Sequence, residues 1–325
     1  MAATKPFVVV LFSRPIPPPD QELLVERAIL AGVADVRAFQ LGEPPVFADE
    51  IFEAAAWLIW QSPPITADVI ARLRGCRALI RNGVGFDSID LAAAAVRGIP
   101  VCNVPDYGTE EVADHSMALV LALCRQVFPL DAQAKRLGWL IPTPEKMRRL
   151  RTLQLGIVGL GRIGTAAALR ARAFGFRVVF YDPYLPSGVE KSIGIGRVAS
   201  LDELLRASDV ISIHCPLTGE TRGFIGEREL ALMKPTAFLV NTARGSIVQK
   251  APLFAALRAG RLAGAGLDVV ENEPLRTPEE AATPNLICTC HAAFCSQEAK
   301  LEMRTSSAKI ARAAVLGEAV WNRVN

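Results

Sequence analysis

The strongest constraint on the fold of this chain is a glycine-rich turn with the spacing Gly159-x-Gly161-x-x-Gly164. An apolar segment, Leu155–Val158, precedes the turn, and a helix rich in small residues is expected over residues 162–174. Gly159 allows the tight bend out of a strand, Gly161 lets the backbone approach a pyrophosphate, and Gly164 lets the helix pack closely on the sheet. The pattern therefore predicts a strand–turn–helix unit that binds a dinucleotide.

The next apolar segment, Arg177–Tyr181, leads directly into an acidic residue, Asp182. At this position, 18 residues after Gly164, a carboxylate can hydrogen-bond a ribose 2′-hydroxyl and would repel a 2′-phosphate. The N–H groups at the start of the intervening helix would face the phosphates. We therefore expect NAD rather than NADP. The alternative, a glycine turn in an unrelated strand–helix–strand unit, is less favoured because strand, helix and acidic residue all stand in place.

Length and composition restrict the remaining possibilities. A chain of 325 residues is expected to form about two domains. The net charge of +3 is small and dispersed, which argues against a nucleic-acid partner. No apolar run reaches the ~18 residues of a membrane span, and the N-terminal residues show no secretory signal. Seven cysteines, an odd number, fit a reducing compartment, so we expect a cytoplasmic protein.

Strands and helices alternate on both sides of the glycine turn. Residues 6–103 contain several short apolar strands separated by helical segments, but no second glycine fingerprint. The alternation resumes after residue 184 and ends in a helix over Glu298–Leu316. This spacing predicts parallel sheets covered on both faces by helices, and hence an α/β fold.

Three successive strands after the glycine turn each present one reactive candidate at or just beyond the carboxyl end: Arg244, Glu273 and His291. Ligands of open α/β sheets bind at these ends. Arginine offers a two-pronged donor for a carboxylate or keto-acid oxygen, and histidine exchanges protons near neutral pH. A carboxylate beside the histidine would fix its tautomer and keep it charged. This set suits hydride transfer to a 2-keto acid.

From about Arg81 to its end, the chain resembles the D-isomer-specific 2-hydroxyacid dehydrogenases, and within them most closely the C-terminal binding protein branch. The matching stretches are R-N-G-V-G-F-D-S-I-D, G-L-G-R-I-G, A-F-G-F-R-V-V-F-Y-D-P-Y, V-N-T-A-R-G, G-L-D-V-V-E-N-E-P and N-L-I-C-T-C-H-A-A-F. Several of them occur throughout the family, whereas F-Y-D-P-Y and H-A-A-F together are more specific. The first 75 residues match only in outline.

The resemblance implies two Rossmann-like or flavodoxin-like domains with parallel sheets. Residues 1–103 and 295–325 would form a discontinuous substrate-binding domain, and residues 104–294 an NAD-binding domain. It implies an NAD-dependent 2-hydroxyacid dehydrogenase in which Arg244 binds substrate, His291 is the acid/base, and Glu273 rather than Glu271 is its partner. Closure of the two domains would exclude water from the reaction.

The resemblance also assigns the residues that surround the two ligands. Those expected at the cofactor are Val84, Gly159, Gly161, Arg162, Ile163, Gly164, Asp182, Cys215, Pro216, Thr221, Thr242, Ala243 and Asp268. Those expected at the substrate are Arg81, Gly83, Val84, Arg244, His291 and Phe294. Animal members of the branch carry tryptophan at the position of Phe294, so we expect a substrate pocket of different size and chemistry.

Other interpretations concern metal, partners and assembly. Cys288-x-Cys290-His291 with Cys295 resembles a metal cluster, but no second cysteine pair completes four ligands, so we expect no metal. The alternative function is an NAD(H)-sensing binding module or co-repressor with weak or no turnover. The sequence ends at Asn325 without the long tail of that branch, which favours an enzyme. The family resemblance predicts a homodimer formed through the apolar helix over Glu110–Gln126. His115 on this helix is interpreted as a packed side chain.

Overall fold

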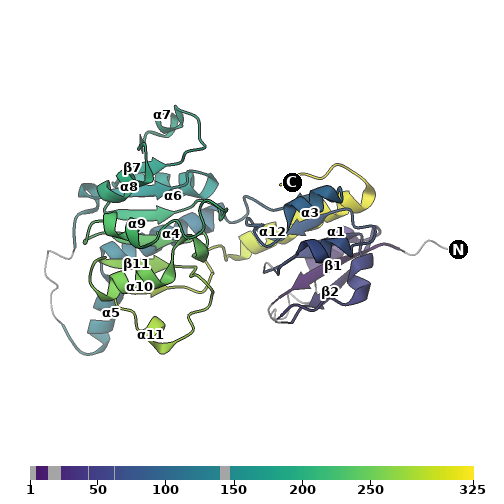
Figure 1. The fold of residues 1–325 in the computed structure, drawn as a ribbon, viewed down its shortest axis with the longest axis horizontal. Coiled ribbons are helices and arrows are strands. Elements are labelled where there is room, and N and C mark those ends of the chain that lie inside the picture. The colour runs from purple at the N-terminus through teal and green to yellow at the C-terminus, as the bar shows by residue number, and fades with distance from the viewer. Residues whose placement is uncertain (1–4, 14–22, 43, 62, 140–146) are drawn as a thin grey trace. The chain divides into compact units, whose positions relative to one another are not determined.

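The computed structural model describes residues 5–13, 23–42, 44–61, 63–139 and 147–325 (Figure 1). The chain forms two compact units, residues 1–108 with 296–325, and residues 109–295. The first unit is therefore discontinuous in sequence. Its boundaries lie at 108/109 and 295/296, where the sequence analysis placed them at 103/104 and 294/295.

The first unit is built on a five-stranded parallel sheet in the order β2-β1-β3-β4-β5. The strands are β1 (Phe7–Phe12), β2 (Asp35–Gln40), β3 (Ala56–Ile59), β4 (Leu79–Arg81) and β5 (Val101–Cys102). Its helices are α1 (Leu24–Leu30), the 3₁₀ helix η2 (Asp49–Glu53), α2 (Ala67–Ala71), α3 (Leu91–Val96) and α12 (Gln297–Leu316). Every residue of β3 is buried, as expected for a central strand covered on both faces. This strand order is that of flavodoxin-like folds.

The second unit is built on a seven-stranded parallel sheet in the order β12-β11-β10-β9-β6-β7-β8. The strands are β6 (Gln154–Val158), β7 (Arg177–Tyr181), β8 (Gly196–Arg197), β9 (Val210–Ile213), β10 (Phe238–Asn241), β11 (Gly264–Leu267) and β12 (Leu286–Cys288). Read from β8, the first six strands have the dinucleotide-binding order 3-2-1-4-5-6, with β12 added at the far edge. The predicted α/β fold of two parallel-sheet domains is confirmed.

Helices cover both faces of the second sheet. They are α4 (Thr109–Cys124), α5 (Val127–Lys135), η4 (Leu150–Thr152), α6 (Arg162–Ala173), α7 (Val189–Ile193), α8 (Leu201–Ala207), α9 (Glu227–Leu232), η5 (Gly245–Ile247), α10 (Lys250–Arg258) and α11 (Pro278–Ala281). One apolar cluster joins α4 and α6 to the sheet, and another joins α8, α9 and α10 to it. The strand order reverses between β6 and β9, and folds of this kind bind ligands at the carboxyl ends of the strands at such a point.

The apolar helix α4, predicted to form a subunit interface, packs within its own unit. Its buried residues join a cluster with α6 and the sheet, and it lies against β10 and β11. Glycines in β11 permit this approach: a Cβ built on Gly266 would lie 3.1 Å from the Cβ of Leu119. The apolar character of α4 is therefore explained without a partner chain.

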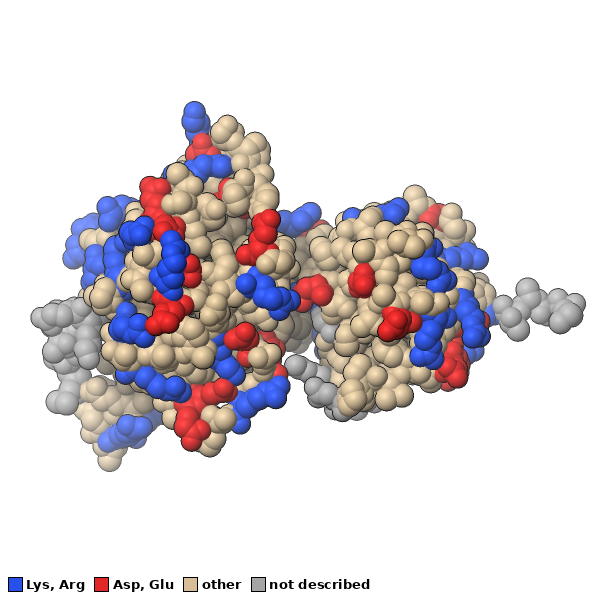
Figure 2. All heavy atoms as spheres, viewed as in Figure 1, with Lys and Arg blue, Asp and Glu red and all other residues tan. Residues whose placement is uncertain are grey.

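On the face shown in Figure 2, lysine and arginine side chains are intermixed with aspartate and glutamate on each unit. Within the ranges that the structure describes, no helix is long and apolar enough to cross a membrane.

A buried ion pair connects the two sequence segments of the discontinuous first unit. Arg304 of α12 donates through Nε and Nη2 to the two carboxylate oxygens of Glu26 on α1, at 2.9 and 2.6 Å. The Glu26 side chain is fully buried and that of Arg304 is 9% exposed. Since a buried charge needs its partner, this pair ties the C-terminal helix to the N-terminal half of the unit.

We predict that Arg304→Leu lowers the free energy of unfolding by about 3–5 kcal/mol, because it leaves the Glu26 carboxylate buried without its counter-charge. Denaturant unfolding measures the loss. The exposed pair Arg72–Asp49 is the matched control, and Arg72→Leu is expected to cost at most ~1 kcal/mol. Equal losses in the two variants would contradict the assigned role of the buried pair.

Candidate active site

The glycine turn connects β6 to α6 in the geometry that the sequence predicted. Gly159 has φ 88°, a left-handed conformation, and a Cβ there would lie 2.6 Å from the backbone nitrogen of Cys215. A Cβ on Gly164 would collide with the carbonyl oxygen of Gly159, whereas a Cβ on Gly161 would meet no atom within 4 Å. The first and third glycines are therefore required by the fold, and the second faces open space.

The Asp182 carboxylate is fixed against this turn. Its Oδ2 accepts a hydrogen bond from the backbone N–H of Leu160 at 2.9 Å, and its Oδ1 accepts one from Tyr184 at 3.0 Å. Leu160 lies between the first two glycines, so this hydrogen bond ties Asp182, at the end of β7, to the glycine turn. Each carboxylate oxygen keeps a second lone pair that can accept a ribose hydroxyl.

The segment after β9 packs onto the other side of the turn. Thr221 donates to the carbonyl of Pro216 at 2.7 Å and accepts from the N–H of Thr218 at 2.8 Å, which makes the loop compact. Burial raises the pKa of the Cys215 thiol to about 12. Removal of its ring from water lowers the pKa of His214 to about 4, and its Nε2 is paired with Ser212 at 2.8 Å. At neutral pH both side chains are uncharged, so neither adds charge beside the turn.

Arg244 follows β10 at the start of η5. Its Nη1 donates to the carbonyl of Ala243 at 2.8 Å, and its own carbonyl accepts from the amide of Asn241 at 2.9 Å. The next residue must be glycine, because a Cβ on Gly245 would collide with the backbone of Val270. The loops that follow β10 and β11 approach each other closely here, and this contact fixes the backbone from which the Arg244 side chain extends.

Glu273 and His291 form a direct pair. His291 Nδ1 donates to Glu273 Oε2 at 3.0 Å, and the two side chains are 39% and 23% exposed. Glu271 has a different partner: its carboxylate accepts a hydrogen bond from the backbone N–H of Lys250, in the first turn of α10, at 3.1 Å. Of the two glutamates in this loop, Glu273 is thus the partner of the histidine. The ring of Phe294 contacts that of His291 edge-on, with centroids 6.4 Å apart.

A buried carboxylate, Asp268, holds the turn that carries His291. The Asp268 side chain is 1% exposed. It accepts hydrogen bonds from the Thr289 hydroxyl at 2.6 Å and from the N–H groups of Ala292 and Ala293 at 2.9 and 3.0 Å. Its backbone carbonyl accepts the N–H of His291 at 2.8 Å. Sequence reasoning expected Asp268 only as a cofactor contact and missed its hold on this turn.

Arg81, Gly83 and Val84 lie together in the first unit. The Arg81 guanidinium folds over the following loop, so that a Cβ on Gly83 would lie 2.8 Å from Nη1. Gly83 has φ 142°, and the carbonyl of Val84 accepts the amide of Asn103 at 2.7 Å. These three predicted substrate residues therefore gather at the carboxyl end of β4.

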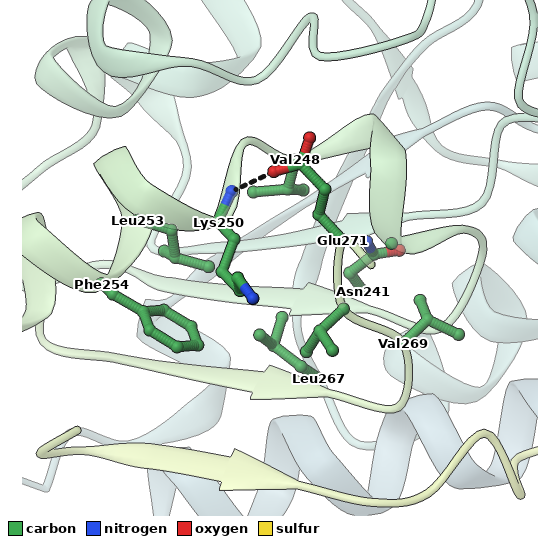
Figure 3. Close-up of a pocket in the computed structure, with 10 residues that line it drawn as sticks. Asn241, Val248, Lys250, Leu253, Phe254, Leu267, Val269 and Glu271 are labelled. Carbon is green, nitrogen blue, oxygen red and sulfur yellow. Dashed lines mark hydrogen bonds between the residues drawn. The ribbon is translucent and has the colours of Figure 1, made fainter. Parts of the chain in front are cut away.

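A small cavity lies among η5, the first turns of α10 and the loop that follows β11 (Figure 3). Its volume is about 10 Å³, and Asn241, Gly245, Lys250, Val270 and Glu271 contribute to its lining. This is the space of about one water molecule, so it is too small for a substrate. Among the described residues, no group of three or more His, Cys, Asp or Glu side chains is placed to hold a metal ion.

Comparison with known proteins identifies the family. The model described as "D-isomer specific 2-hydroxyacid dehydrogenase, NAD binding domain" matches residues 117–293. The chain is 38% identical over 308 residues to a glyoxylate reductase of Aeropyrum pernix, covering 91% of each protein. It is 36% identical over 282 residues to a D-3-phosphoglycerate dehydrogenase of Methanocaldococcus jannaschii, covering 85% of this chain but 53% of that protein.

The chain belongs to the D-isomer-specific 2-hydroxyacid dehydrogenase family. Among solved structures it is similar to a D-lactate dehydrogenase from Aquifex aeolicus in complex with NAD and lactic acid, with a TM-score of 0.84, 30% identity and 96% of each chain covered. The predictions of an NAD-binding domain and of an NAD-dependent oxidoreductase are confirmed at the level of this family.

The residues of the second unit fit NAD as the dehydrogenase cofactor. Arg162 and Ile163 begin α6, where N–H groups lack intrahelical partners and no side chain caps the helix. Gly161 leaves open space above the turn, and Asp182 stands at its side. After β10, the hydroxyl of Thr242 is buried without a hydrogen-bond partner among the described residues, so it can pair with a ligand.

The three glycines give a testable separation of fold from binding. We predict that Gly161→Ala weakens NADH binding about 10-fold or more with little change in Tm, because its methyl group would occupy the pyrophosphate position. Gly164→Ala should lower both Tm and NADH affinity, because its methyl group collides with Gly159. Fluorescence titration and thermal unfolding measure the two quantities. A Gly161→Ala protein that binds NADH normally would contradict the placement of the cofactor.

Proposed function

We propose that this chain reduces a small 2-keto acid to the D-2-hydroxy acid with NADH, with His291 as the proton donor and Arg244 as the substrate clamp. The observation that carries the proposal is the hydrogen-bonded His291–Glu273 pair on the NAD-binding unit. A general acid held by a carboxylate, at the carboxyl ends of the strands that follow the glycine turn, is what carbonyl reduction requires.

Proton delivery follows from the orientation of the imidazole. Because Nδ1 donates to Glu273, the protonated ring presents its second N–H, at Nε2, to a substrate. NADH supplies a hydride to the carbonyl carbon. The π electrons of the C=O bond take the proton from Nε2, which leaves NAD⁺, a hydroxyl group and neutral imidazole. Glu273 stabilises the charged imidazolium before transfer and fixes the ring's tautomer.

Two arginines are the candidates that we propose for binding an anionic substrate. We infer that the guanidinium of Arg244, anchored to Ala243, binds the keto-acid carboxylate or carbonyl oxygen through its planar donor set. We also assign Arg81 with the Gly83–Val84 loop to substrate binding. The support is a guanidinium folded against a glycine-rich loop at the end of a parallel strand.

The substrate we propose is glyoxylate or another 2-keto acid of similar size. A glyoxylate reductase is among the relatives that this chain matches over almost its whole length. The Phe294 ring against His291 is an apolar side chain beside the proton donor, which favours a small substituent on the keto carbon. The finer likeness to the C-terminal binding protein branch remains a prediction. An NAD(H)-sensing module without turnover is less favoured, because such a module does not need the His291–Glu273 pair.

We also propose a cytoplasmic location and a homodimer. All seven cysteines are unpaired, as in a reducing compartment.

Exposed apolar side chains follow α4: Phe128 is 53% exposed, Leu137 95% and Trp139 90%. Large apolar side chains that are exposed on a single chain can be buried against a second copy of it. We predict a dimeric mass by light scattering and a monomeric mass for Phe128→Glu with Trp139→Glu; a monomeric wild type would contradict the proposal.

For the catalytic assignment, we predict that His291→Ala lowers kcat for glyoxylate reduction by about 10²–10⁴-fold while NADH affinity is kept, because the variant loses the general acid. Arg244→Ala should instead raise KM for the keto acid as well as lower kcat. Steady-state rates and NADH titration separate the two effects. Unchanged turnover in His291→Ala would exclude it as the proton donor.

A further inference from the structure

His115 stands in an unexpected polar environment. It lies in the middle of α4, where its helical neighbours are largely buried and apolar. Its Nε2 is nevertheless 3.0 Å from the hydroxyl oxygen of Thr289 and 3.7 Å from Oδ1 of Asp268. The side chain is 27% exposed. The interpretation as a packed histidine is therefore incomplete, because the ring faces the residues that hold the catalytic turn.

The direction of the hydrogen bonds in this chain of groups is fixed by chemistry. An ionised carboxylate only accepts, so the Thr289 hydroxyl donates its single proton to Asp268 at 2.6 Å. The Thr289 oxygen must then accept from His115, and His115 must carry a proton on Nε2. The order is His115 N–H to Thr289, and Thr289 O–H to Asp268. It holds whether the imidazole is neutral or charged.

Asp268 passes this constraint to His291. The same carboxylate accepts the N–H groups of Ala292 and Ala293, and the Asp268 carbonyl accepts that of His291. His291 has φ 55°, a left-handed conformation that a non-glycine residue keeps only when its surroundings hold it. The orientation of the Asp268 carboxylate therefore sets the direction in which the His291 ring leaves the backbone.

We propose that His115 is a positioning residue for the proton donor: through Thr289 it fixes the rotation of the Asp268 carboxylate and thereby the His291 turn. The proposal rests on the proposed function, in which His291 delivers the proton. His115 does not touch the reacting atoms. Without the His115 side chain, the Thr289 oxygen has no donor. The Thr289 hydroxyl and the Asp268 carboxylate can then rotate together.

The variants follow from the hydrogen-bond order. His115→Ala removes the donor, whereas His115→Gln retains an N–H donor close to the position of Nε2. Thr289→Val removes the bridging hydroxyl, and Thr289→Ser keeps it. Asp114→Ala is the matched control on the same helix, because it breaks only the exposed ion pair with Arg170. The threonine pair keeps the test decisive if His115→Ala does not fold.

Two readouts are needed, because one must not depend on turnover. The chain has three histidines, His115, His214 and His291, so ¹⁵N spectra of the imidazoles can be assigned by single substitutions. We expect His115→Ala and Thr289→Val to move the His291 ring signals and to lower kcat about 10-fold to 100-fold, with NADH affinity unchanged, because small displacements of a catalytic group are costly. The Gln, Ser and Asp114→Ala variants should behave as wild type.

The outcomes separate this proposal from the proposed function. A His291 signal that stays unchanged in both His115→Ala and Thr289→Val overturns the positioning role, whatever the rates. A loss of kcat that His115→Gln does not restore assigns His115 a structural role only. If wild type shows no turnover with any 2-keto acid, the proposed function fails, and the His291 signals alone decide the positioning role.

Discussion

The candidate site depends on one buried carboxylate. Asp268 is almost fully removed from water, and a buried charge is tolerated only when donors surround it. The turn after β12 supplies those donors from Thr289, Ala292 and Ala293, and in doing so adopts the conformation that presents His291 to Glu273. The electrostatic requirement of a single side chain at the end of β11 is thus met by the loop that carries His291, the proposed acid/base.

The other candidate site residues of the second unit lie at the same edge of the sheet. The glycine turn follows β6, Asp182 follows β7, Arg244 follows β10 and Asp268 follows β11, and all these strands run parallel. Close packing fixes the loops relative to one another: Gly159 against Cys215, and Gly245 against Val270. A parallel sheet therefore gathers residues far apart in sequence without needing a long-range contact for each.

Much of this could be predicted from the sequence, for identifiable reasons. The glycine turn and its strands have strong local patterns, and the fold class follows from alternation. The sequence analysis missed α7 and β8, since residues 189–197 form short, largely polar elements with little periodicity. The contact of His115 with Thr289 was not predicted, because the two residues are 174 positions apart in sequence and the neighbours of His115 on α4 are largely apolar. The Glu26–Arg304 pair joins residues 278 apart, which no local pattern indicates.

The most direct test of the account is NADH oxidation by the wild-type chain with a panel of 2-keto acids that begins with glyoxylate. We predict turnover with one NADH consumed for each 2-hydroxy acid formed, fastest with the smallest keto acids. NADPH should be a poor substitute, because Asp182 would repel its 2′-phosphate. Tight NADH binding without oxidation by any member of the panel would contradict the assignment of His291 as a working proton donor and favour a binding module.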